Sequence, residues 1–426
     1  MSRSITRRET LKTLAAGAFC LAGAELRAEN EKSLPPVRTI TRGPLHHWFG
    51  YYDKLEFDPS NRYVLSNEVS FEHRTPTAED QIGVGMIDTQ NQDRWIPLGT
   101  SNAWGWQQGC MLQWRPGNTQ EVVWNDRDGE HHVCRVKNIQ TGMSRTLPRP
   151  IYTLSPDGKW AVTADFSRIQ RMRPGYGYIG LTDPCHAELA PAESGVWRMN
   201  METGESELIF SLADAARIPH QGELLKNQWH YFNHLLISPD SSRMIVLHRW
   251  RENQDGEPTG KFWTRMFTLN LDGSDRYVLD PSGHTSHFIW RDPEHICAWT
   301  KPFEDQPAKF YLFRDKTQDV ELVAPEVMPV NGHNTYLPIA GNEWILNDTY
   351  PQGAERLQTP YLYHVPSGKR FDLGHFPLPK LYQGEWRCDL HPRSNRDGTI
   401  IAIDSPHTGS GRQVHLIDVK DILNLV

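Results

Sequence analysis

The sequence predicts an all-β protein, a seven-bladed β-propeller, and two independent counts along the chain predict it. A turn proline follows a short apolar segment seven times, at Pro59, Pro116, Pro156, Pro239, Pro293, Pro338 and Pro392. An alternating strand followed by a polar turn also occurs seven times, beginning at residues 84, 133, 196, 266, 310, 361 and 414. Such a repeat suits one four-stranded blade per unit.

The first 28 residues are predicted to be an export signal rather than part of this fold. Arg7 and Arg8 precede the apolar run 14–22, and small-residue cleavage candidates follow at 22–24 and 26–28. This pattern is typical of twin-arginine export. The alternative is an N-terminal membrane anchor, for which the apolar run is short. We therefore expect a periplasmic or secreted protein with no stable membrane insertion after processing.

The propeller is expected to occupy residues 35–426 as one domain. Segment 37–41 has the character of a strand that could pair with the last blade and close the ring. The interval from Pro156 to Pro239 is the longest, at 83 residues, and about residues 168–194 within it form a predicted insertion over one face. This insertion contains "RMRPGYGYIG", in which basic and aromatic residues stand together.

Composition narrows the classes of function. The 15 tryptophans and 14 tyrosines among 426 residues suit strands and surfaces that stack on sugar rings. The net charge is -7, and removing residues 1–28 takes away five basic and two acidic residues, which leaves -10. Without a basic block no nucleic-acid partner is expected, and an anionic substrate would need a local basic cleft. The cysteines show no CxxC spacing, and the GxSxG, Walker and dinucleotide fingerprints are absent.

The innermost strand of each propeller blade lines the central channel, so residues at one offset before the turn should form a ring. Five residues before the proline, with a shift of one from Phe288 to His287 in the fifth repeat, stand Lys54, Met111, Ile151, His234, His287, His333 and Arg387. One such histidine alone would be read as a hydrogen-bonded channel residue. Three in consecutive blades, flanked by cations, are costly to bury without a ligand. They could bind a divalent metal such as Mn or Zn, or divide into one base and two ligands.

The surroundings of these histidines carry a resemblance to a known family. In "NHLLISPD", "HTSHFIW" and "NGHNTY" the sequence resembles the oligogalacturonate lyases of polysaccharide lyase family 22, and more loosely the ulvan lyases, which are also seven-bladed propellers. The resemblance covers most of residues 40–426. It implies that His234 is the base and that His287 and His333 bind metal. Asn331 and Met328 stand where that family carries a second histidine and a glutamine.

The sequence therefore predicts a secreted lyase that cleaves uronate-containing oligosaccharides or polysaccharides by β-elimination. Charge neutralisation of the carboxylate is assigned to Arg387 and Lys54, with a metal on His287 and His333 and with His234 as a third candidate ligand. Proton removal is assigned to His234. Because ulvan lyases use tyrosine, histidine and arginine without a catalytic metal, Tyr176, Tyr178 or a water is the candidate acid.

Two alternatives remain open from the sequence. The first is a non-catalytic propeller, similar to the TolB-type periplasmic propellers, that binds a glycan or a protein at its mouth. The second is a glycosidase, which would need two carboxylates at the mouth. The ring offset supplies no carboxylate, and only Asp53 and Asp389 lie near it. A further polar stretch lies at the far end of its strand pair and consists of His248, Arg249 and Trp250. The sequence favours a structural and a functional role for it equally.

Overall fold

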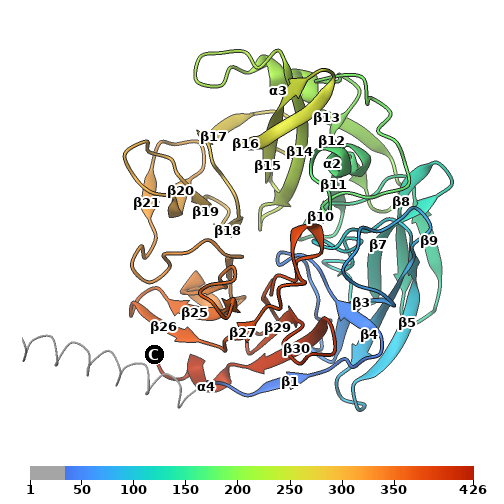
Figure 1. Cartoon of the computed structure of the whole chain (residues 1–426), viewed down its shortest axis with the longest axis vertical. Helices are drawn as coiled ribbons and strands as arrows, with labels where there is room; N and C mark the ends of the chain where they lie inside the picture. Colours follow the sequence, from blue (N-terminus) through green and yellow to red (C-terminus); the bar gives the residue numbers. More distant parts are fainter. Residues whose placement is uncertain (1–33) are drawn as a thin grey trace, which may run out of the picture.

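Seven four-stranded antiparallel sheets surround a common centre in the computed structural model, which describes residues 34–426 (Figure 1). The predicted seven-bladed β-propeller is confirmed. The predicted export signal, residues 1–28, lies outside the described residues. In the part of the chain that is described, no helix is long and apolar enough to cross a membrane.

Blades 1 to 4 each use four strands in chain order. Blade 1 consists of β2 (His46–Trp48), β3 (Tyr63–Val69), β4 (Ile82–Asp88) and β5 (Arg94–Ser101). Blade 2 consists of β6 (Gln113–Trp114), β7 (Glu121–Asp128), β8 (His131–Asn138) and β9 (Ser144–Leu147). Blade 3 consists of β10 (Thr153–Leu154), β11 (Trp160–Thr163), β12 (Gly195–Asn200) and β13 (Ser206–Ser211). Blade 4 consists of β14 (Gln228–Ile237), β15 (Arg243–Gln254), β16 (Glu257–Asn270) and β17 (Tyr277–Gly283).

The last three blades complete the ring. Blade 5 consists of β18 (Phe288–Asp292), β19 (His295–Thr300), β20 (Lys309–Arg314) and β21 (Val320–Leu322). Blade 6 consists of β22 (Thr335–Tyr336), β23 (Trp344–Asn347), β25 (Tyr361–His364) and β26 (Lys369–Asp372), with a separate pair of β24 (Leu357–Gln358) and β27 (Phe376–Pro377). Blade 7 consists of β28 (Arg393–Ser394), β29 (Ile400–Ser405), β30 (Gln413–Asp418) and β1 (Val37–Thr39). Short helices lie between or after strands: α2 (Phe166–Met172), α3 (Leu212–Arg217), α4 (Lys420–Leu423), η1 (Ala340–Asn342) and η2 (Gly384–Trp386).

The two ends of the described chain meet in blade 7. β1 pairs antiparallel with β30, with Val37 opposite Ile417 and Thr39 opposite His415. The blade thus combines one strand from the start of the chain with three from its end. Sheets pack face to face around the ring, and the buried side chains form clusters shared by neighbouring blades, as Val123, Val162 and Phe232 of blades 2, 3 and 4 illustrate.

A buried ion triad supports the seam between blades 7 and 1. The Arg393 guanidinium donates to Glu56 (Nε···Oε2 2.7 Å) and to Asp404 (Nη2···Oδ1 3.0 Å). Asp404 also accepts the backbone N–H groups of Phe49 (3.1 Å) and Gly50 (3.2 Å). Burial raises the pKa of Glu56 to about 7, against the lowering effect of Arg393. Two carboxylates therefore compete for one guanidinium in a site closed to water.

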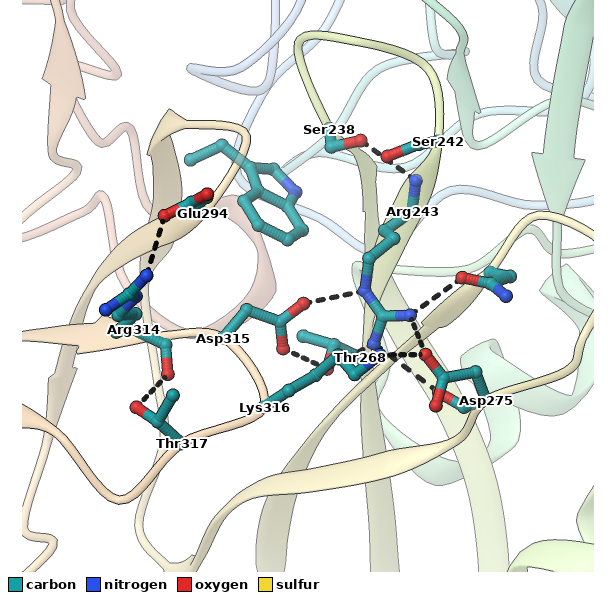
Figure 2. Close-up of polar contacts among 12 residues, drawn as sticks. Ser238, Ser242, Arg243, Thr268, Asp275, Glu294, Arg314, Asp315, Lys316 and Thr317 are labelled. Atoms are coloured by element: carbon teal, nitrogen blue, oxygen red, sulfur yellow. Dashed lines mark hydrogen bonds and ion pairs between the residues drawn. The ribbon is translucent and has the colours of Figure 1, made fainter.

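A second network links blade 4 to blade 5. Figure 2 shows Arg243 donating to Asp315 (2.6 Å) and Asp275 (2.9 Å), while Thr268 donates to Asp315 (2.5 Å). Lys316 also donates to Asp275 (2.5 Å). The turn between β14 and β15 is thereby fixed to the turn that follows β20.

The long interval in the chain forms a segment between β11 and β12, residues 164–194, that includes α2. Asp165 caps α2 by accepting the N–H groups of Ser167 (2.9 Å) and Arg168 (3.0 Å). The Arg168 guanidinium is buried and pairs with Asp183 (2.8 Å). It also donates to backbone carbonyls of residue 230 on β14 and of residues 185, 188 and 189 within the segment. One side chain therefore fastens the segment to blade 4.

Candidate functional site

Equivalent positions in the blades can be found from the hairpin that joins the first and second strands of each blade. One residue before its turn donates its backbone N–H to a carbonyl on the other strand of the hairpin. In blade 4 this residue is Ser238 (N···O 2.8 Å), and in blade 7 it is Asn395 (N···O 2.9 Å). His234 lies four residues before Ser238, and His391 lies four residues before Asn395. Both histidines have a positive φ, of 51° and 43°. His391 is therefore the blade 7 equivalent of His234.

Arg387 does not stand at this position, contrary to the offset counted from the sequence. That count took Pro392 as the turn proline, but the hairpin of blade 7 turns at residues 395–398, where Arg396 occupies the place of a proline. Arg387 lies in the loop after η2, and its guanidinium donates to both oxygens of Asp389 (2.6 Å each). Its charge is therefore already opposed.

Blades 4 to 7 bring four buried histidines to the centre of the ring, each 2–6% exposed: His234, His287, His333 and His391. The ring centroids of His287 and His333 are 4.3 Å apart, as are those of His333 and His391. Tyr51 contacts both His234 and His391: its ring stacks on His234 (5.0 Å between ring centroids) and meets His391 edge-on (5.3 Å). Burial lowers the pKa of His234, His287 and His391 well below the ordinary value, so these three rings are neutral at neutral pH.

Hydrogen bonds orient two of these rings. His333 Nδ1 donates to Asp348 (2.9 Å), which also accepts the His333 backbone N–H (2.7 Å). His287 Nδ1 donates to the Asn331 amide oxygen (3.0 Å), which can only accept. Because burial lowers the pKa of His287, its Nε2 carries the lone pair, and Tyr350 Oη lies 3.4 Å from that atom. A histidine held through Nδ1 in this way is the usual arrangement of a metal ligand.

His333, Asp389 and His391 form a candidate metal centre, because one donor atom from each lies within 4.8 Å of the others. These three residues fit a divalent ion, because imidazole and carboxylate ligands bind Mn or Zn. The hydrogen bond from His333 to Asp348 already orients one of the ligand rings. Asp389 oxygens that accept from Arg387 retain further lone pairs for a cation. Neither His234 nor His287, both predicted as ligands, belongs to this three-residue group.

His234 has different neighbours. Its Nε2 lies 3.4 Å from Arg173 Nη1, and because a guanidinium can only donate, Nε2 carries the lone pair. Its Nδ1 then holds the proton and donates to Tyr152 Oη (3.2 Å), which in turn donates to the Gln108 amide oxygen (3.1 Å). The lowered pKa arises from burial first, and then from Arg249 and Arg173. His234 therefore has the protonation state of a general base.

Two arginines beside His234 lack a carboxylate partner among the described residues: Arg173, from the segment between β11 and β12, and Arg249, from β15. Arg249 is 2% exposed, its Nε donates to Thr264 (3.0 Å), and its Nη1 has no hydrogen-bond partner within residues 34–426. The hydroxyl of the adjacent Tyr231 is likewise buried without a partner there. Burial, and after it the charge of Arg173, lowers the pKa of Arg249 to about 10. Cations left unpaired in this way favour an anionic ligand.

Of the two predicted acid candidates, Tyr176 lies at the histidines and Tyr178 does not. Tyr176 meets His234 edge-on (5.8 Å), and the Arg173 guanidinium lies 3.6 Å from the centre of its ring. Tyr178 instead packs in the hydrophobic core, and its hydroxyl accepts from the Asn125 amide (2.8 Å). The prediction that Tyr178 serves as an acid at the histidines therefore has no support in this geometry.

Lys54 is paired with Asp53 (2.8 Å) and does not join the two arginines. Its side chain is buried and lines a separate cavity of about 620 Å³ on the side of the hairpin turns, whose wall includes Pro156, Pro239, Pro293 and Pro338. Lys54 therefore lines this cavity, while its amine lies 5.3 Å from the centre of the Tyr152 ring, whose hydroxyl bonds to His234.

The set of site residues predicted from the sequence did not include His391, Asp348, Tyr51, Tyr350, Arg173 or Arg249. A signal existed for some of them. The alternation of Arg387, Asp389 and His391 placed a carboxylate and an imidazole on one face, and the stretch "RMRPGYGYIG" contains Arg173. Arg249 stands in the stretch 248–250, for which the sequence favoured neither a structural nor a functional role.

Comparisons with known proteins identify the fold. No protein-family model matches the sequence, and no curated protein matches it. An oligogalacturonate lyase from Vibrio parahaemolyticus superposes with a TM-score of 0.63 at 14% identity, over 91% of this chain and 94% of that one. An oligogalacturonate lyase in complex with manganese gives 0.63 at 14% identity, over 90% and 93%. The tricorn protease gives 0.50 at 11% identity, over 89% of this chain and 35% of that one.

The chain has the propeller fold of the oligogalacturonate lyases. The resemblance predicted from the histidine stretches is thus confirmed at the level of the fold. At 14% identity the likeness says nothing about activity, which has to be argued from the residues of this chain.

Proposed function

We propose that this protein is a lyase that cleaves uronate-containing oligosaccharides by β-elimination at the cluster around His234. The observation that supports this most is a neutral, buried histidine beside two arginines that have no carboxylate partner within residues 34–426. β-Elimination needs a group that opposes the charge of the C5 carboxylate, a base for the C5 proton and an acid for the leaving oxygen at C4. The cluster offers a candidate for each.

Each step uses a group with suitable chemistry. Arg173 and Arg249 bind the carboxylate and oppose the negative charge that grows on it as the proton leaves. Nε2 of His234 takes the C5 proton, and the bond from Nδ1 to Tyr152 holds the ring in the required tautomer. Tyr176, which meets His234 edge-on, protonates the oxygen at C4. The bond from C4 to that oxygen breaks while the C4–C5 double bond forms.

A divalent cation forms a second part of the proposal. It would be held by His333, His391 and Asp389, with His287 adjacent, and would add positive charge near the carboxylate. Manganese in the oligogalacturonate lyase complex is one support for this, and Mn or Zn would suit the ligands. Export through the twin-arginine route, predicted from residues 1–28, would place the enzyme with polymeric or oligomeric uronates outside the cytoplasm.

The test is to incubate the purified protein with pectic, ulvan and glucuronan oligosaccharides and to follow the absorbance of the unsaturated product. We expect product from at least one of them, and a loss of about 10³-fold in kcat/KM in His234→Ala. An exposed arginine exchanged in Arg217→Gln serves as the control and should leave the rate unchanged. Absence of product from all three substrates would contradict the proposal. Binding without turnover would instead support the non-catalytic, TolB-like propeller.

A further inference from the structure

The hairpin of β15 and β16 differs from the other hairpins in its length. Its strands have 12 and 14 residues, whereas the second and third strands of the other blades have 4 to 8. The hairpin is fastened to the segment that carries Arg173, because Arg251 donates to the Met172 carbonyl (3.0 Å) and Arg171 to the Gly256 carbonyl (3.3 Å). A hairpin longer than those of the other blades is therefore held beside Arg173 and Arg249.

The strand register decides which side chains face these arginines. Arg251 lies opposite Phe262 and Arg249 lies opposite Thr264, and directly opposed residues share a face of the sheet. The intervening Trp263, opposite Trp250, belongs to the other face. Phe262 thus stands on the face that carries Arg249.

Phe262 lies against both arginines. The guanidinium groups of Arg249 and Arg173 lie 4.6 Å and 4.9 Å from the ring centre. Phe262 is nevertheless 37% exposed, so a substantial part of its surface faces solvent. A large aromatic side chain left in water beside the buried Arg249 and the half-buried Arg173 is expensive to maintain unless a ligand covers it.

We propose that Phe262 is a stacking subsite for the sugar ring adjacent to the uronate held by Arg173 and Arg249. The ligand is an anionic oligosaccharide of at least two residues: its carboxylate meets the arginines and the apolar face of its next ring lies on Phe262. This inference rests on the proposed uronate ligand but not on its cleavage. It predicts that chain length is sensed by a residue outside the reacting centre.

The experiment measures binding in a protein that does not turn over its ligand. In a His234→Ala background, the affinities for galacturonate monomer, trigalacturonate and uncharged maltotriose are determined by calorimetry. We expect Phe262→Ala to weaken trigalacturonate binding about tenfold, to change monomer binding less than twofold, and Phe262→Tyr to restore the trisaccharide affinity. Trp263→Ala, one residue away on the opposite face, is the matched control and should bind like the parent.

The outcomes separate the two proposals. An affinity for trigalacturonate that Phe262→Ala leaves unchanged, or that Trp263→Ala lowers equally, overturns the subsite even where the wild-type protein is an active lyase. No binding of trigalacturonate at all also overturns it. Binding that depends on Phe262, in a protein whose wild type releases no unsaturated product, supports the subsite and contradicts the lyase.

Discussion

Glu56→Gln tests the buried triad at the seam between blades 7 and 1. Arg393 lies between Glu56 and Asp404, and all three are nearly inaccessible to water. Glu56 Oε1 has no partner among the described residues, and burial raises the pKa of the group from 4.5 to about 7. The folded protein therefore holds a proton on Glu56 that the unfolded chain releases at lower pH.

The sign and size of the effect follow from linkage. A carboxyl group whose pKa is higher in the folded state stabilises the protein below the unfolded pKa, and this contribution is lost as pH rises through the folded pKa. A shift of about 2.5 units, from 4.5 to about 7, corresponds to about 3 kcal/mol lost between about pH 4.5 and pH 7. Glu56→Gln keeps an acceptor for Arg393 but cannot ionise, so its stability should lack this decline.

Urea unfolding followed by tryptophan fluorescence at pH 5, 6, 7 and 8 measures the difference. We expect the free energy of unfolding of Glu56→Gln relative to wild type to rise with pH by about 2–3 kcal/mol. Glu207→Gln, which removes the exposed partner of Arg198, should show no such dependence. Parallel pH profiles for wild type and Glu56→Gln would refute the assignment of a proton to Glu56.

Three further predictions concern the site. Arg249→Gln should lower kcat/KM by at least about 10²-fold without lowering the melting temperature, because it removes a buried charge that has no carboxylate partner in the described part of the chain. A fall of several degrees would contradict this. Arg168→Lys should increase proteolysis between residues 173 and 194 and reduce activity, because a lysine cannot bind all the carbonyls that the Arg168 guanidinium binds. Unchanged cleavage would show that other contacts hold the segment in place. Because the pKa of His234 is lowered, kcat/KM should stay level as pH falls from 8 to below 6.5, and a decline centred near 6.5 would mean that another group is the base.

The parts of the fold that repeat were accessible from the sequence, because seven units can be compared with one another. The proline count succeeded in this way, and it failed at blade 7, where Arg396 replaces the proline and the offset selected Arg387 instead of His391. Lys54 matches the ring position, yet a sequence offset does not show which partner a long side chain takes, and its amine pairs with Asp53. Tyr176 and Tyr178 could not be told apart because they share an irregular loop.

The residues that could not be predicted are those that carry the charge. In blades 4 to 7 the repeated position supplies imidazoles, and those of His234, His287 and His391 remain neutral when buried and so cost little within the ring. Cations are far more expensive to bury. The buried Arg249 and the half-buried Arg173 come from the two elements that depart from the repeat, the long β15–β16 hairpin and the segment between β11 and β12. Such elements have no equivalent in other blades, so no internal comparison reveals them. An arginine kept buried without a carboxylate lowers stability, and binding of an anion would recover that loss. The departures from the propeller repeat are therefore where the specificity of this protein should be sought.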